Sequence, residues 1–180
     1  MLKSNYFYFI VLTFIFILVY PYIFDEKIFL GGDNAEYYSL AQGIVNDWSY
    51  APSYAPIQVP ANHFPPGYPF ILALLIKIGV SSFTGLKIAN GLFLLGTVLI
   101  TYLLCLRFTS KHIFSGLIAL SVLLNMHLLD YSTIVMSEIP FVFISLLSFY
   151  CFTKFIDSGF KLKSLAFVFT VIGCIAAVYI

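Results

Sequence analysis

Charged residues are scarce in this chain of 180 amino acids, where they make up 9% of the sequence. A soluble domain carries about 25%, and the 61% of hydrophobic residues excludes a water-soluble globule. The formal net charge of +1 leaves no basic field that would gather nucleic acid, so a nucleic-acid partner is excluded. Cysteine is also rare. Cys105, Cys151 and Cys174 all lie inside apolar runs, where they are expected to pack as small hydrophobic residues rather than form disulfides or a metal site.

The chain is rich in long apolar runs. A helix needs about 20 apolar residues to cross a hydrocarbon core of about 30 Å. Five runs reach or approach this length: 5–24, 88–106, 113–129, 139–156 and 164–180. The sequence therefore predicts an all-α, polytopic integral membrane protein with about five transmembrane helices. No small-residue cleavage site follows the first run, which predicts an uncleaved anchor. The last run reaches Ile180 without a polar flank, so we expect an N-terminal part of a longer protein.

The placement of cations predicts the orientation of these helices. Short cytoplasmic loops collect Lys and Arg. With the N-terminus inside and five spans, the inner side receives Lys3, Arg107, Lys111, Lys154, Lys161 and Lys163. Treating a shorter apolar run, 67–80, as a sixth span would move all but Lys3 of these outside, so we expect 67–80 to be an interfacial helix. The acidic residues then gather on the outer side, with the exception of Asp157.

Residues 25–86 become one long outer loop that holds most of the unusual chemistry. The segment 34–47 has helical apolar periodicity after a start typical of a capping box, which predicts an amphipathic helix on the membrane surface. Prolines between this helix and 67–80 favour an extended connection.

Two carboxylates are the candidates for catalysis or metal binding. Asp33 follows Gly31 and Gly32 at the start of the first interfacial helix, and Glu138 stands before the helix predicted for 139–156. Either acid is equally well explained by the preference for carboxylates at helix N-termini. If both faced one pocket at the outer surface, they would offer acid–base or metal chemistry.

Further polar and aromatic residues of this outer region are candidates for substrate binding. His63 is a candidate hydrogen-bond donor, and Lys87 a candidate ligand for a phosphate, although a polar residue at the membrane interface explains each as well. Tyr37 and Tyr68 are candidates for stacking on a sugar or an isoprenyl chain, with an aromatic belt as the alternative.

Four motifs, in order, resemble the membrane-embedded glycosyltransferases of the C superfamily (GT-C). They are similar above all to relatives of protein O-mannosyltransferases and of aminoarabinose transferases. GGDNAEYYSLA matches the acidic motif of the first outer loop, HFPPGYPFILALLIKIGV the second interfacial helix, and MSEIPF the acidic residue that opens a later span. In LKIANGLFLLGTVLITYLL, Lys87 takes the place of a frequent Arg.

The resemblance implies an inverting hexosyl- or pentosyltransferase that uses a polyprenyl-phosphate-linked sugar at the outer membrane face. Asp33 would take the catalytic acidic position, and Asn34 stands where many relatives have a second acid. Glu36, one turn into the helix, is a candidate substrate-binding residue. His63 is separated from Pro65 by Phe64, which departs from the family's His-Pro-Pro pattern. The family is divided on metal dependence, so a divalent ion such as Mg²⁺ or Mn²⁺ at Asp33 and Glu138 is left open. The acceptor, whether glycan, lipid or protein, is also left open.

Two other functions remain as alternatives. A transporter or flippase of lipid-linked sugars would bind through the same outer loop, but transporters place charges near the bilayer midplane, and the centres of these spans hold none. A non-catalytic subunit would use Asp33 as a helix cap only. The short loops and the Lys-, Ile- and Phe-rich composition favour a bacterial plasma membrane.

Overall fold

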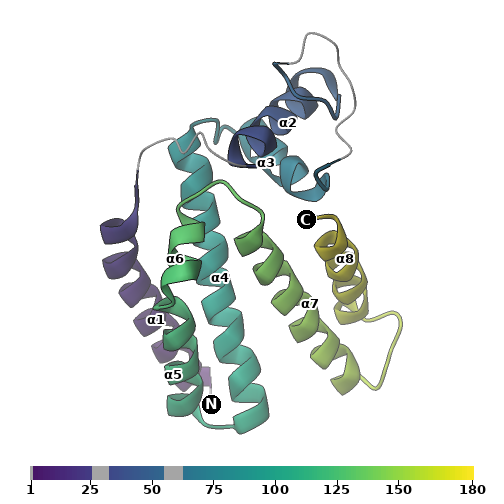
Figure 1. Cartoon of the computed structure of the whole chain (residues 1–180). Coiled ribbons are helices and arrows are strands. Elements are labelled where there is room, and N and C mark those ends of the chain that lie inside the picture. Colours follow the sequence, from purple (N-terminus) through teal and green to yellow (C-terminus); the bar gives the residue numbers. More distant parts are fainter. Residues whose placement is uncertain (1, 26–32, 55–62) are drawn as a thin grey trace.

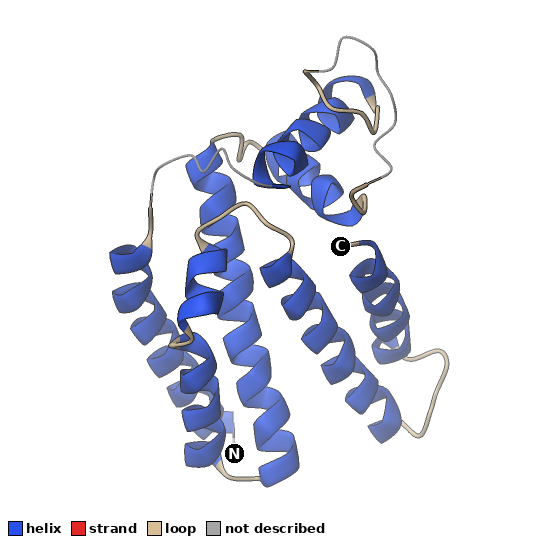
Figure 2. Ribbon diagram, viewed as in Figure 1, coloured by secondary structure: helices blue, strands red, loops and turns tan. Residues whose placement is uncertain are grey.

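A computed structural model describes residues 2–25, 33–54 and 63–180, with side chains from Asn5 onward. All regular structure in these ranges is helical (Figure 2). The helices are α1 (Leu2–Ile23), α2 (Asp33–Asp47), α3 (Gly67–Lys77), α4 (Phe83–Thr109), α5 (His112–Leu123), α6 (Met126–Ser132), α7 (Glu138–Asp157) and α8 (Leu165–Tyr179). The predicted fold class, an all-α polytopic membrane protein, is confirmed.

The helices form a bundle with a small layer across one end. In Figure 1, α1, α4, α5 with α6, α7 and α8 run alongside one another, while α2 and α3 lie together beyond the ends of α4 and α7. The N-terminus lies at the opposite end of the bundle, and the C-terminal end of α8 lies beside α3. Successive long helices therefore run in alternating directions through the bundle, as expected for successive membrane spans.

Fewer helices have the length of a full span than the five expected. Three of them, α1 from Asn5, α4 and α7, are long and apolar enough, and α5 with α6 adds a fourth if this bent pair counts as one span. The pair bends by 58° where the side-chain oxygen of Asn125 accepts a hydrogen bond from the Leu128 amide and caps a new helix. Helix α8 has 15 residues, about 22 Å of helix, which is less than the hydrocarbon thickness.

Two hydrophobic cores hold the molecule together. The first lies within the bundle and joins α1, α4, α5, α6 and the start of α7 through residues such as Phe16, Leu94 and Leu123. The second joins α2 and α3 to the beginning of α4 and to the loop before α7; it includes Tyr37, Tyr68, Leu72, Leu86 and Val135. The second core fixes the α2–α3 layer against the bundle end.

The two ends of the bundle differ in the sign of their net charge. The acidic end comprises α2, α3, the start of α4 and the start of α7, and it carries Asp33, Glu36, Asp47 and Glu138 beside the two cations Lys77 and Lys87. The basic end comprises the α4–α5 and α7–α8 connections, and it carries Arg107, Lys111, Lys154, Lys161 and Lys163. At the basic end Arg107 forms two hydrogen bonds, of 2.5 and 2.6 Å, to the carboxylate of Asp157, which ties α4 to α7.

Candidate active site at the acidic end

Asp33 is the first residue of α2, and its side chain is exposed. The next residue, Asn34, is fully buried, and its Oδ1 accepts a hydrogen bond of 2.8 Å from the Ala35 amide. A carboxylate at position 34 would have to lose its hydration there, which is costly for a charged group. The burial explains why an amide, rather than a second acid, follows Asp33.

Glu138 is exposed at the first residue of α7, on a segment that is distant in sequence from α2. The residue before it, Ser137, shares a hydrogen bond of 3.2 Å with the hydroxyl of Tyr37, one turn after Asp33 on α2. This bond links the start of α7 directly to the helix that carries Asp33.

The pKa of the Tyr37 phenol depends on its burial and on nearby groups. Burial raises the pKa of Tyr37 above its usual value, and the hydrogen bond with Ser137 opposes this rise. The negative charges of Asp33 and Glu138 add to the rise in the pKa of Tyr37. A pKa raised in this way keeps the phenol of Tyr37 neutral at physiological pH.

A buried amide on α4 organises the segment that leads into Glu138. The Asn90 side chain is 1% exposed, and its Nδ2 donates to the carbonyls of Ile134 at 2.6 Å and Met136 at 3.1 Å. Its Oδ1 accepts a hydrogen bond of 3.1 Å from the hydroxyl of Tyr68, which is fully buried on α3. One side chain thus joins α3, α4 and the loop before α7.

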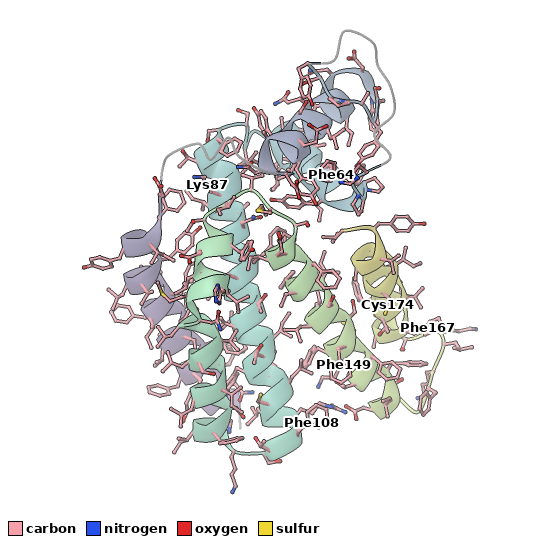
Figure 3. The ribbon with its side chains drawn as sticks, viewed as in Figure 1. Phe64, Lys87, Phe108, Phe149, Phe167 and Cys174 are labelled. Atoms are coloured by element: carbon pink, nitrogen blue, oxygen red, sulfur yellow. The ribbon has the colours of Figure 1, made fainter. Side chains whose placement is uncertain are left out.

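Lys87 lies one turn before Asn90, at the upper end of α4 in Figure 3. The residue is 2% exposed, and its ammonium donates a hydrogen bond of 2.7 Å to the carbonyl of Asp25. Its own carbonyl accepts a hydrogen bond of 3.1 Å from Tyr20, whose hydroxyl also donates to Ser132 at 3.0 Å. In this arrangement Lys87 holds the end of α1 to α4, and its predicted contact with a phosphate stays a prediction.

The remaining predicted binding residues are placed around this centre. Glu36 accepts a hydrogen bond of 2.8 Å from Tyr54, so its carboxylate is directed to the segment after α2. His63 is exposed and its ring stands edge-on to Phe64, which in turn packs edge-on against Tyr37. Tyr68 also packs edge-on against Tyr37, with ring centres 5.1 Å apart. The substrate roles predicted for these residues stay predictions.

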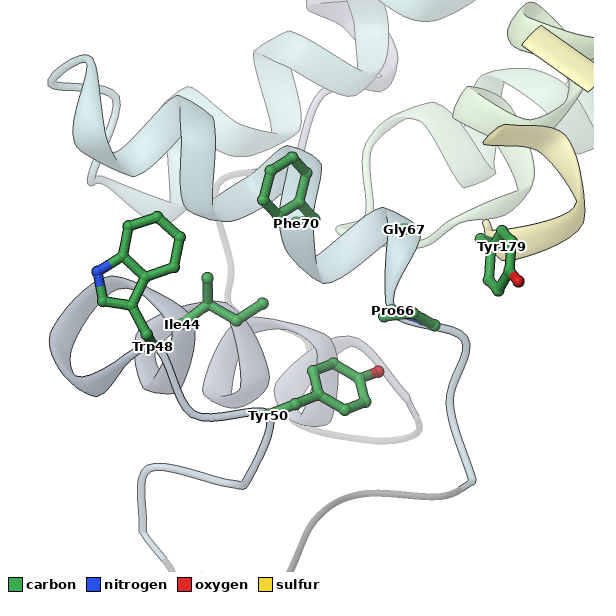
Figure 4. A pocket seen from close by; sticks show the side chains of 7 residues that line it. All are labelled: Ile44, Trp48, Tyr50, Pro66, Gly67, Phe70 and Tyr179. Carbon is green, nitrogen blue, oxygen red and sulfur yellow. The ribbon is translucent and has the colours of Figure 1, made fainter. Parts of the chain in front are cut away.

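An open apolar pocket of about 380 Å³ lies between α2, α3 and the end of α8 (Figure 4). Its walls are largely aromatic and are formed by Ile44, Trp48, Tyr50, Pro66, Gly67, Phe70 and Tyr179. Trp48 follows the last residue of α2 and has a positive φ of 53°, and the ammonium of Lys77 lies 3.9 Å from the centre of its ring. Neither Asp33 nor Glu138 lines this pocket, so the apolar pocket and the two carboxylates are neighbouring but separate features.

A metal site formed by these side chains alone is not evident. Among the residues that the structure describes, no group of three or more His, Cys, Asp or Glu side chains is arranged to hold a metal ion. Asp33 and Glu138 are only two carboxylates, fewer side chains than a site made only of protein groups needs.

Sequence reasoning missed the buried hydrogen bonds that assemble the site. Asn90 was not singled out, although an amide inside the apolar run 88–106 is a polar group that must find partners in a membrane. The rule that a polar group in a membrane must find partners was the signal that could have identified Asn90. The partners, Tyr68 and two backbone carbonyls, come from segments 22 to 46 residues away and carry no local pattern.

Comparison with known proteins places these features in a family. No curated protein and no solved structure gave a significant match to the chain. The family model for dolichyl-phosphate-mannose-protein mannosyltransferases matches residues 54–180, well over half of the chain. The match includes His63, Tyr68, Lys87 and Glu138, whereas Asp33 lies before it. The chain belongs to the dolichyl-phosphate-mannose-protein mannosyltransferase family, and so to the glycosyltransferases of the GT-C type.

Proposed function

We propose that the protein transfers a sugar from a polyprenyl-phosphate donor to an acceptor hydroxyl at the acidic end of the bundle. The family assignment supports a lipid-linked donor and favours mannose as the sugar and a protein as the acceptor over a glycan or a lipid. The basic end carries most of the cations, which by the positive-inside rule supports a position of the acidic end at the outer face of the membrane. In a bacterium, this is the outer face of the plasma membrane.

The observation that carries the proposal is the hydrogen bond of 3.2 Å between Tyr37 and Ser137, which joins the helix that carries Asp33 to the start of the helix that carries Glu138. Asp33 and Glu138 come from α2 and α7, both are exposed, and the charge of each raises the pKa of Tyr37. Structural helix caps need no such convergence, because each would serve its own helix. Two acids beside one neutral hydroxyl are suited to moving a proton and to orienting a polar substrate.

In the proposed reaction, the carboxylate of Asp33 accepts the proton of the acceptor hydroxyl. The acceptor oxygen then forms a bond to the anomeric carbon as the bond from that carbon to the phosphate oxygen breaks, which inverts the anomeric centre. The polyprenyl phosphate leaves with the electron pair. Glu138 orients the acceptor or the sugar through hydrogen bonds, and the neutral phenol of Tyr37 adds a donor that burial keeps protonated.

The test compares sugar transfer by membranes that contain wild-type protein with membranes that contain Asp33→Asn. The amide keeps the shape of the side chain but accepts no proton, so we expect the transfer rate to fall by a factor of about 100 or more. Asp47→Asn, at the other end of the same helix, is the matched control and should retain wild-type transfer.

An Asp33→Ser variant separates catalysis from helix capping. Serine is a good N-cap residue but not a base, so a cap tolerates the change and a catalytic carboxylate does not. Wild-type transfer by Asp33→Asn, or full transfer by Asp33→Ser, would contradict the role of Asp33. Loss of transfer with the Asp47→Asn control would show that any charge lost from α2 is harmful.

A further inference from the structure

We propose that the groove between α1 and α5 at the basic end binds one anionic phospholipid of the adjacent leaflet. The proposal does not rest on the transfer reaction, since the groove lies at the opposite end of the bundle from Asp33 and Glu138. Two adjoining hollows form it. One, of about 530 Å³, begins at Lys111 and follows the first two turns of α5, and the other, of about 160 Å³, lies between α5 and α1.

The two hollows adjoin each other, since Ile113 and Leu117 line both of them. From Lys111 to Leu120 the groove follows α5 for about 14 Å, which is roughly half of the hydrocarbon thickness. Its walls are apolar beyond the first residues, and Ile113 and Leu117 are both exposed. A groove of one leaflet's depth suits an acyl chain that enters from that leaflet.

The groove floor is set by a close approach of the two helices. A side chain at Gly116 would collide with the ring of Tyr8 on α1, so glycine permits the contact. The ring of Tyr8 also stacks on Tyr102 and on His112, with ring centres 5.4 and 5.8 Å apart. These contacts make the groove a fixed feature of the helix pair.

Charge at the mouth of the groove favours an anionic headgroup. Lys111 is exposed, and within the described residues no ion pair involves it. The carboxylate of Asp157, at the same end of the bundle, is engaged with Arg107. The Nδ1 atom of His112 lies 2.9 Å from the hydroxyl of Tyr102, which fixes the imidazole at the wall beside Lys111. A phosphate at this position meets a cation and a polar ring directly above an apolar channel.

Native mass spectrometry of the protein released from nanodiscs of phosphatidylglycerol and phosphatidylcholine in equal parts tests this site. We expect a retained phosphatidylglycerol molecule. Lys111→Gln should lower its retention about fivefold, because one cation at the headgroup level is lost. Leu117→Trp fills the groove and should remove the retained lipid. Lys163→Gln, another cation of the basic end, and Phe169→Trp, on the exposed face of α8, are the matched controls.

Unchanged retention in both Lys111→Gln and Leu117→Trp would overturn the proposal, as would an equal loss in the two controls, which would indicate general annular lipid. Equal retention of phosphatidylcholine would overturn the choice of an anionic headgroup. If another helix covered the groove, the wild-type protein would retain no phosphatidylglycerol, and this result would also overturn the proposal. If Leu117→Trp does not yield a monodisperse, helical protein, Lys111→Gln decides the outcome.

Discussion

The two ends of the bundle differ in charge and also in how their polar groups are held. At the acidic end, buried hydrogen bonds join segments that are far apart in sequence: Asn90 to the loop before α7, Tyr68 to Asn90, and Tyr20 to Ser132. At the basic end, the ion pair of Arg107 and Asp157 is partly exposed, and one further hydrogen bond joins the buried Tyr102 to His112, ten residues away. Buried hydrogen bonds between distant segments therefore predominate at the acidic end, whereas the ion pair at the basic end is weakened by water.

The comparison shows that buried polar groups are concentrated at the acidic end of this protein. Unpaired amides and hydroxyls are costly away from water, so they persist where several can satisfy one another. In this chain they gather under the two exposed carboxylates. The result is a rigid base for Asp33 and Glu138, whereas the basic end needs only to bring its cations to the membrane surface.

Among the variants that test this comparison, Asn90→Leu is expected to have the largest effect on stability. The change leaves the carbonyls of Ile134 and Met136 and the hydroxyl of Tyr68 without their partner, and we expect a loss of about 2 kcal/mol in the free energy of unfolding. Sugar transfer should fall as well, because Glu138 follows this loop. Reversible unfolding in mixed micelles measures the first effect. Stability and transfer equal to wild type would show that Asn90 does not organise the site.

A smaller effect is expected from Tyr20→Phe. The phenol donates to the carbonyls of Lys87 and Ser132, and its removal should cost about 1 kcal/mol in the same unfolding measurement. Tyr102→Phe at the basic end keeps the stacked rings and loses a bond of 2.9 Å to His112 and a long one of 3.4 Å to Asn5, so it serves as the matched control with a smaller loss. A larger loss in the control would reverse the ranking of the two ends.

The titration of Tyr50 should reveal the burial of the acidic end. Burial raises its pKa from 10.0 to about 12, with smaller contributions from Tyr37 and Glu36. The folded state therefore favours the neutral phenol, so its contribution to stability is complete below pH 10 and is lost as the pH rises toward 12. The difference in tyrosinate absorbance between wild type and Tyr50→Phe measures this step. Ionisation of Tyr50 with the ordinary pKa of an exposed tyrosine would contradict its partly buried position.

The smallest effect is expected from Arg107→Gln. The carboxylate of Asp157 is 51% exposed, so solvent screens the pair. Its removal, together with the hydrogen bond from Arg107 to the Thr153 carbonyl, should cost little stability and leave transfer at the wild-type rate. Salt-dependent unfolding of wild type and variant is the measurement. A loss of stability comparable to that of Asn90→Leu would show that the two ends are held equally firmly.

Much of the architecture could be predicted from the sequence, because hydrophobic runs and amphipathic periods are local patterns. Helices lie at 33–47 and 67–77, where interfacial helices were expected over 34–47 and 67–80. The break between α5 and α6 was not predicted, since an apolar run does not reveal that Asn125 will cap a new helix. Composition therefore located the apolar segment but missed its bend.

The candidate site was predictable only in part. Acidic residues at helix starts stand out in the sequence, so Asp33 and Glu138 could be chosen as a pair. Their common neighbour Tyr37 and the buried position of Lys87 depend on contacts between distant segments, which no spacing encodes. The connections through residues 26–32 and 55–62 lie outside the described residues, and the expectations for that part of the outer loop stay predictions.

The most direct test of a single reaction site at the acidic end is the transfer rate of Asp33→Asn, Glu138→Gln and the double variant. Groups that act as one unit show strongly non-additive losses. We therefore predict that the double variant transfers sugar at nearly the rate of Asp33→Asn alone. Losses that multiply would assign the two carboxylates to independent roles, and an unimpaired Asp33→Asn would contradict the site itself.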